Sequence, residues 1–117
     1  MREIIFYETL SGKKPVEDFL DTLSYKQAQK ATWVFKLVEE LDIVPSQYFK
    51  KLKNTDGLWE VRVLFGSDIF RFLGFFDGPS LVVLTHAFQK KTPKTPSNAI
   101  RTAEERKRDY WERRTAK

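Results

Sequence analysis

The fold is decided by residues 58–88, LWEVRVLFGSDIFRFLGFFDGPSLVVLTHAF, where three β-rich runs are separated by two short turns. Alternating apolar side chains and many β-branched or aromatic residues are typical of strands. The turns carry the signals of tight connections, Gly66-Ser67 in the first and Asp77-Gly78 in the second. The stretch therefore predicts an antiparallel meander with strands over Leu58–Phe65, Ile69–Phe76 and Leu81–Phe88.

Helical patterns and one more strand flank this meander. Pro15, followed by acidic residues, predicts a helix start, and Ser24 predicts the N-cap of the next helix. The expected outer elements are a strand over Glu3–Glu8, a helix from Pro15, a helix from Ser24 to about Asp42, and a last helix capped by Ser97 and running from Asn98 to about Arg114.

The order β-α-α-β-β-β-α predicts an α+β fold in one domain, residues 1–117. We expect a small, mostly antiparallel sheet with the N-terminal helical hairpin on one face, and a C-terminal helix. The second face of the sheet should then be partly open.

The composition excludes several kinds of protein. Hydrophobic residues make up 41% of the 117 residues, which favours a compact core over disorder. The chain has no cysteine and one histidine, so disulfides, thiolate catalysis and multi-histidine metal sites are excluded within one chain. No cluster of carboxylates stands out, so we expect no metal and no cofactor. The N-terminal apolar run is too short for a signal peptide or a membrane span, which favours a cytoplasmic protein without a membrane partner.

Charge is unevenly distributed along the chain. Residues 1–48 hold six Lys and Arg against eight Asp and Glu, whereas residues 49–117 hold fifteen against eight. A basic half of this kind favours a polyanionic partner, nucleic acid first, although a merely soluble basic surface explains the totals equally well. If the partner is RNA, we expect Lys50, Lys51, Lys53, Lys94 and Arg106 to contact it.

Two arginines interrupt the apolar pattern of the first two meander strands. If the connection between these strands has two residues, Arg62 faces Arg71 on the same side of the sheet. Like charges in facing positions repel, so a purely structural sheet would avoid them, whereas a bound phosphate would make the pair favourable. The alternative is that Glu60 and Asp68 neutralise the two guanidinium groups.

The stretch HAFQKKTPKTP, residues 86–96, adds cations where the third meander strand ends. The hairpin turn before this strand places Lys90 and Lys91 at the end of the sheet that holds Arg62 and Arg71. Four cations then converge on one rim. A solvated strand end would explain the lysines as well, but it explains the arginine pair less well.

Crowded cations with few other reactive groups suit cleavage of RNA by its own 2′-hydroxyl. Arginines neutralise the transition state, and a lysine among them has a lowered pKa and can act as general base or acid. His86 shares the strand parity of Phe88 and Val82, which favours a buried, hydrogen-bonded histidine over a catalytic one. We also expect Arg71 to be exposed, so that Arg71→Ala removes activity and leaves the fold intact.

The second predicted helix carries an apolar patch away from its main stripe. Trp33 and Leu37 lie nearly opposite the stripe that Ala31, Val34, Phe35, Val38 and Leu41 form at helical spacing. They either pack on the preceding helix, which is the interpretation we favour, or contact a partner protein.

Four motifs lie in order along the second half of the chain: GLWEVR (57–62), FRFLGFF (70–76), HAFQKKTPKTP (86–96) and AEERKRDY (103–110). Together they resemble the HigB-like branch of the RelE/ParE toxin superfamily. The resemblance implies a RelE-like fold and the toxin of a type II toxin–antitoxin system. Such a toxin enters the ribosomal A site, cleaves messenger RNA and is neutralised by a cognate helix-turn-helix antitoxin, HigA-like in this branch. The alternatives are a ParE-like inhibitor of DNA gyrase, which is a binding module without nuclease activity, and a plain RNA-binding protein.

The resemblance also implies roles for individual residues. The family's phosphate-binding arginine corresponds to Arg71, and the arginine that closes the preceding strand's motif corresponds to Arg62. The basic position just after the last strand corresponds to Lys90 or Lys91.

This chain departs from the RelE pattern at the general base. RelE has lysines where this chain has Leu58 and Glu60, and a tyrosine near the position of Ile100. The base is therefore open between a lysine such as Lys90 and His86.

Overall fold

The computed structural model describes residues 1–90 and 94–116. In chain order the elements are β1 (Glu3–Phe6), α1 (Pro15–Asp21), α2 (Tyr25–Glu40), β2 (Phe49–Lys51), β3 (Trp59–Phe65), β4 (Asp68–Asp77), β5 (Leu81–Lys90) and α3 (Ser97–Thr115). The predicted α+β class and the order of the predicted elements are confirmed. One short strand, β2, was not predicted, because three residues carry no alternation that a sequence pattern can reveal.

The strands form one five-stranded sheet in the order β1-β5-β4-β3-β2. Strands β2 to β5 are antiparallel to their neighbours, and β1 is parallel to β5. Phe65 pairs with Asp68, as the two-residue connection predicts. The predicted meander is therefore confirmed, together with the register of its β3–β4 pair, whereas the β4–β5 pair contains a register shift at Leu73/Gly74. Strand β1 is added beside β5 as an edge strand.

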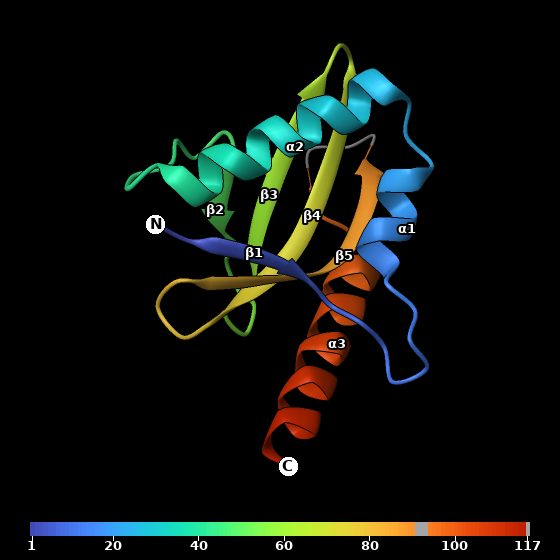
Figure 1. The fold of residues 1–117 in the computed structure, drawn as a ribbon, viewed down its shortest axis with the longest axis vertical. Helices are drawn as coiled ribbons and strands as arrows, with labels where there is room; N and C mark the ends of the chain where they lie inside the picture. The colour runs from blue at the N-terminus through green and yellow to red at the C-terminus, as the bar shows by residue number, and fades with distance from the viewer. Residues whose placement is uncertain (91–93, 117) are drawn as a thin grey trace.

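One face of the sheet is covered by the two N-terminal helices. Figure 1 shows α2 lying across β3 and β4, with α1 beside β5. The predicted stripe of α2 is buried, and Phe35 meets Phe72 of β4 edge to face at a centroid distance of 5.0 Å. A capping box fixes the start of α2, because Ser24 and Gln27 exchange side-chain to backbone hydrogen bonds. This face holds the larger core.

The other face is covered along part of its length by α3, which runs down and away from β5 in Figure 1. Ala99 and Ala103 pack with Leu58 and Leu73, and the second half of the helix packs on Phe75. This helix thus covers part of the face that we expected to be partly open. The helix begins at Ser97 with Pro96 at the N-cap position, so the predicted Ser97 cap is wrong by one residue.

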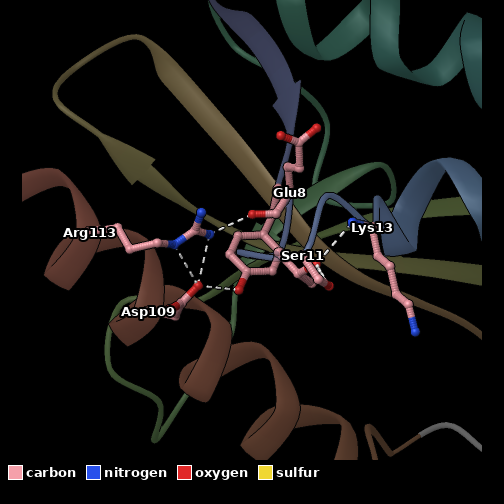
Figure 2. A network of polar contacts seen from close by, with 7 residues as sticks. Glu8, Ser11, Lys13, Asp109 and Arg113 are labelled. Carbon is pink, nitrogen blue, oxygen red and sulfur yellow. Dashed lines mark hydrogen bonds and ion pairs between the residues drawn. The ribbon is translucent and has the colours of Figure 1, made fainter.

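A polar network ties the far end of α3 to β1 and the loop that follows it. Figure 2 shows Arg113 donating hydrogen bonds to the carboxylate of Asp109 and to the backbone carbonyl of Glu8. Asp109 also accepts a hydrogen bond from the hydroxyl of Tyr7. The hydrogen bond from Tyr7 is the first cause that lowers the pKa of Asp109. The network holds the second half of α3 against the residues that follow β1.

Within the described ranges, none of the helices has the length and apolar character needed to span a bilayer.

Candidate active site

Arg62 and Arg71 are direct partners in the β3–β4 ladder. The facing arrangement predicted from the sequence is therefore confirmed. Both side chains lie on the face that α3 covers, because Leu73, two residues along from Arg71, packs with Ala99 and Ala103 of that helix. The arginine pair lies beyond these contacts, toward the β3–β4 turn.

Arg71 is neutralised by a buried carboxylate. Its NH1 atom lies 2.6 Å from Oε1 of Glu60, and the two side chains are 3% and 0% exposed. The expectation of an exposed Arg71 is wrong. The alternative in which Glu60 neutralises an arginine holds for Arg71, whereas Asp68 accepts a hydrogen bond from Gln89 instead.

Glu60 also anchors the chain that leads into α3. Its second oxygen, Oε2, accepts a hydrogen bond from the hydroxyl of Thr95 at 3.2 Å. A carboxylate without exposed surface is stable in a protein only when its oxygens are paired. Glu60 therefore joins β3, β4 and the segment before α3 at one point.

Arg62 has a different environment from Arg71. It makes no ion pair with any described residue, and its Nε atom is buried without a hydrogen-bond partner among them. Its backbone N–H donates to the carbonyl of Tyr48, which fixes the strand at this point. Its guanidinium group is therefore held close to Arg71 without a carboxylate of its own.

Lys90 joins this face because β5 contains a bulge. Leu73 pairs with His86 but its neighbour Gly74 pairs with Leu84, so Thr85 is an extra residue in β5. Beyond the bulge the strand alternation is reversed. Lys90 pairs with Ile69 and lies on the side of the arginine pair.

The ammonium group of Lys90 is strongly perturbed. The residue is 5% exposed, and its Nζ is buried without a hydrogen-bond partner among the described residues. Burial lowers the pKa of Lys90 to about 8, and the positive charges of Arg71, Arg62 and Lys50 act in the same direction, against the carboxylate of Glu60. A lysine with this pKa exchanges its proton near neutral pH.

His86 lies away from the arginine pair. Its Nδ1 is 3.3 Å from NH1 of Arg106, and its ring stacks on Phe88 at 5.5 Å. Burial, with a smaller contribution from the charge of Arg106, lowers the pKa of His86 to about 4. The favoured interpretation of a largely buried, hydrogen-bonded histidine fits this position. The predicted parity with Val82 is wrong, because the bulge at Thr85 lies between the two residues.

Of the lysines predicted to bind RNA, Lys50 and Lys51 lie on opposite faces of the sheet, and the others lie outside the strands. Lys50 pairs with Glu60 across β2 and β3 and is exposed on the side of the arginine pair. Lys51 follows it on the strand and therefore points to the opposite face. Lys53 and Lys94 are exposed, and Lys91 lies outside the described residues.

Arg106 is half-buried, and its guanidinium group faces β5. Its NH1 donates to the carbonyl of Thr85 at 2.8 Å and lies against His86. The structure therefore places this predicted RNA-binding residue inward, on the β5 bulge.

Trp33 does not pack on the preceding helix, which was the interpretation that we favoured for Trp33 and Leu37. Trp33 is 47% exposed, and its ring contacts Tyr48 at 5.8 Å rather than the preceding helix, with Lys30 Nζ 5.1 Å from its centroid. Leu37 is half-buried. A partner contact through this patch stays a prediction.

Sequence reasoning overlooked how central Glu60 is. The signal was present, because alternation places Glu60 on the same side of the sheet as Arg62, two residues before it on the strand. The bulge also had a signal, since a glycine inside a strand pattern, here Gly74, often marks such an irregularity. Neither signal gives the contacts themselves.

The cluster is suited to holding an anion. Arg62, Arg71, Lys90 and Lys50 gather around the carboxylate of Glu60, and Nε of Arg62 and Nζ of Lys90 are buried without hydrogen-bond partners among the described residues. Planar guanidinium groups match phosphate oxygens, and a lysine of lowered pKa can take up a proton. In the described part of the chain, no three His, Cys, Asp or Glu side chains come together as a metal site would require.

The model of a family described as Phage derived protein Gp49-like (DUF891) matches residues 18–108, which include α2, the whole β2–β5 sheet and most of α3. No curated protein matches the chain.

Proposed function

Since this chain belongs to the phage-derived Gp49-like family, a family of RelE-like and toxin-like proteins, we propose that it is the toxin of a type II toxin–antitoxin pair. The finer assignment is to the HigB-like branch with a RelE-like fold, and the motifs at residues 57–62, 70–76, 86–96 and 103–110 support it. The proposed partner is a cognate helix-turn-helix antitoxin of the HigA type. Messenger RNA on the ribosome, in the cytoplasm, is the proposed target.

The proposed activity is metal-independent cleavage of messenger RNA. One observation carries it: Arg62 faces Arg71 across β3 and β4, with Lys90 beside them and the carboxylate of Glu60 paired with Arg71. The 2′-oxygen of the substrate attacks the adjacent phosphorus, and the bond from phosphorus to the 5′-oxygen of the next nucleotide breaks. The products are a 2′,3′-cyclic phosphate and a 5′-hydroxyl, whose oxygen takes a proton from water. The guanidinium groups stabilise the extra negative charge of the transition state.

Lys90 is the general base in this proposal. Its neutral amine takes the proton of the 2′-hydroxyl, and a pKa of about 8 leaves a useful neutral fraction at physiological pH. His86 is the weaker candidate, because its pKa of about 4 makes it a poor proton acceptor and its Nδ1 lies against Arg106. Lys91, which lies outside the described residues, remains a prediction from the sequence as a second basic group near the scissile phosphate.

Burial determines the order in which the RNA meets the site. Arg71 is 2% exposed and Lys90 is 5% exposed, whereas Arg62 is half-buried and Lys50 is exposed. The RNA backbone would therefore contact Lys50 and Arg62 first. Direct contact with Arg71 and Lys90 requires the side chains that shield them to move apart.

A growth and primer-extension experiment tests the proposal. The wild-type protein, Arg62→Ala and the control Arg101→Ala, an exposed arginine on α3, are expressed from a tightly regulated promoter. We expect growth arrest and discrete cleavages in messenger RNA for the wild type and the control, and neither for Arg62→Ala. Intact message together with relaxed or broken DNA would instead favour the gyrase inhibitor. Binding to RNA without cleavage or growth arrest would favour a plain RNA-binding protein.

A further inference from the structure

The β5 bulge determines which side of the sheet Lys90 occupies. Before the bulge, Val82 and Leu84 point into the core under α1 and α2. After it, Phe88 packs in the cluster beneath α3, and Lys90 is two residues further along the same side. Without the extra residue, Lys90 would alternate with Leu84 and would point away from Arg71.

We infer that Arg106 is a positioning residue, which holds the bulge at Thr85 and thereby keeps Lys90 beside Arg62 and Arg71. Its consequence for RNA cleavage rests on the proposed function, whereas its consequence for the place of Lys90 does not. Arg106 lies on α3 and touches neither arginine of the pair in any described contact.

Arg106 supplies a hydrogen-bond donor to the backbone carbonyl of the bulged residue, Thr85. An extra residue in a strand leaves its backbone groups outside the regular ladder, and a buried carbonyl without a donor is costly. NH1 of Arg106 donates to the carbonyl of Thr85 at 2.8 Å and also lies 3.3 Å from Nδ1 of His86, the next residue. One guanidinium group therefore satisfies the bulged residue and holds its neighbour. A charged donor makes a stronger hydrogen bond than a neutral one.

Gly74 of β4 lies opposite the bulge and allows the two strands to approach closely there. A Cβ atom on Gly74 would lie well inside van der Waals contact of the carbonyl oxygen of Val83 and 2.9 Å from Cδ2 of Leu84. The backbones of β4 and β5 therefore approach each other closely where the register changes. Glycine permits the bulge, and Arg106 stabilises it from the helix.

The two sides of β5 resist a complete change of register. Phe88 belongs to the cluster beneath α3, and Ala87 packs against the other core. A one-residue slip would exchange these two environments. Loss of Arg106 should therefore loosen the segment from Thr85 to Lys90 locally, and the ammonium group of Lys90 would leave the charge cluster for solvent part of the time.

The experiment follows Lys90 directly by NMR titration of lysine side chains in the full-length protein, with Lys90→Met used to assign its signal. In the wild type the pKa of Lys90 is expected near 8. In Arg106→Ala we expect it to rise by about one unit or more, toward that of an exposed lysine. In the control Arg101→Ala, which removes an exposed arginine from the same helix, it should not change.

Two conservative variants separate the hydrogen bond from the charge and cover the case in which Arg106→Ala does not fold. Arg106→Gln keeps a neutral N–H donor, and Arg106→Lys keeps a charged one. We expect both to hold the pKa of Lys90 closer to the wild-type value than Arg106→Ala does. A Lys90 pKa unchanged in Arg106→Ala, or raised equally in Arg106→Gln and Arg106→Ala, would overturn the inference.

An activity readout completes the test. Misplacing a reacting group by about 1 Å can reduce a rate by about 10²-fold, so Arg106→Ala should cleave RNA that much more slowly, with partial rescue in Arg106→Lys. If the wild-type protein cleaves no RNA, the proposed function fails while the titration still decides the role of Arg106. If the wild type cleaves RNA and the pKa of Lys90 is the same in Arg106→Ala as in the wild type, only the positioning role of Arg106 fails.

Discussion

Arg71 and Glu60 form an ion pair with almost no exposed surface, with NH1 and Oε1 2.6 Å apart and side chains 3% and 0% exposed. The carboxylate comes from β3 and the guanidinium group from β4, so the pair also joins the two strands that carry the facing arginines. Glu60 orients the guanidinium group of Arg71 by a direct ion pair, and the nearby cations Arg62, Lys90 and Lys50 leave the cluster with a net positive charge. Arg71 is therefore both a structural residue and a candidate phosphate ligand.

Arg71→Ala should destabilise the fold. Removing one partner leaves the charge of Glu60 buried and unpaired, which typically costs about 3–5 kcal/mol. Urea unfolding at pH 7 measures this loss. The double variant Arg71→Met with Glu60→Leu should recover most of the stability, because it removes both charges and keeps a similar volume, and it should still be inactive. A single Arg71→Ala variant as stable as the wild type would contradict the structural role of the pair.

Arg62→Ala should affect activity far more than stability. Arg62 makes no ion pair with the described residues and has a buried Nε without a partner there, so its removal leaves no orphan carboxylate among them. We expect a loss of about 10²–10³ in the rate of RNA cleavage, as for one transition-state donor, and a change of less than about 1 kcal/mol in the free energy of unfolding. Arg101→Ala is the matched control for both measurements. Full activity of Arg62→Ala would place the reaction elsewhere.

Lys90 should reduce the stability of the fold at neutral pH. Its pKa is about 8 in the folded protein against 10.5 for an ordinary lysine. Below pH 8 Lys90 is protonated in both the folded and the unfolded protein, so the folded state carries the cost of a buried charge. Above pH 10.5 Lys90 is neutral in both states, and that cost is absent. The free energy of unfolding should therefore rise between about pH 8 and pH 10.5.

Lys90→Met tests that dependence on pH. We expect it to raise the free energy of unfolding at pH 7 by roughly 1–3 kcal/mol and to remove the rise above pH 8. Lys53→Met, at an exposed position, should do neither. An equal rise above pH 8 in Lys90→Met would show that another group titrates there.

The rate of RNA cleavage should follow the neutral form of Lys90. If Lys90 is the general base, kcat/KM increases about tenfold for each pH unit below its pKa and levels off above about pH 8. The same profile is expected in His86→Gln, because the pKa of His86 lies near 4, well below this range. A rate that instead falls above pH 8 would make Lys90 the general acid or a purely electrostatic group.

Gly74→Ala should destabilise the β4–β5 pair. The new methyl group would meet the backbone carbonyl of Val83, which cannot move without disturbing the ladder. Overpacking of this kind costs about 1–3 kcal/mol. Gly66→Ala is the contrasting variant, since no atom lies near its added methyl group and only the positive φ opposes it. Only Gly74→Ala should also alter the amide hydrogen exchange of residues 85–90.

The sequence by itself determined the three-strand meander and the facing arginine pair. Turn residues are local signals, so Gly66-Ser67 fixed the connection, and the connection fixed Phe65 opposite Asp68 and Arg62 opposite Arg71. The start of α1 and the capping of α2 at Ser24 followed from local signals in the same way. The concentration of cations in the second half of the chain is also a property of the sequence alone.

Only the tertiary structure decided how these groups are buried and paired. Alternation along a strand places residues correctly until an extra residue enters, and the bulge at Thr85 reversed the sides of His86 and Lys90. The ion pair of Arg71 with Glu60 depends on burial, which comes from elements distant in the sequence and not from either strand. Local sequence fixes register because turns are short-range, whereas charge and proton affinity depend on every group that packing brings within a few ångströms.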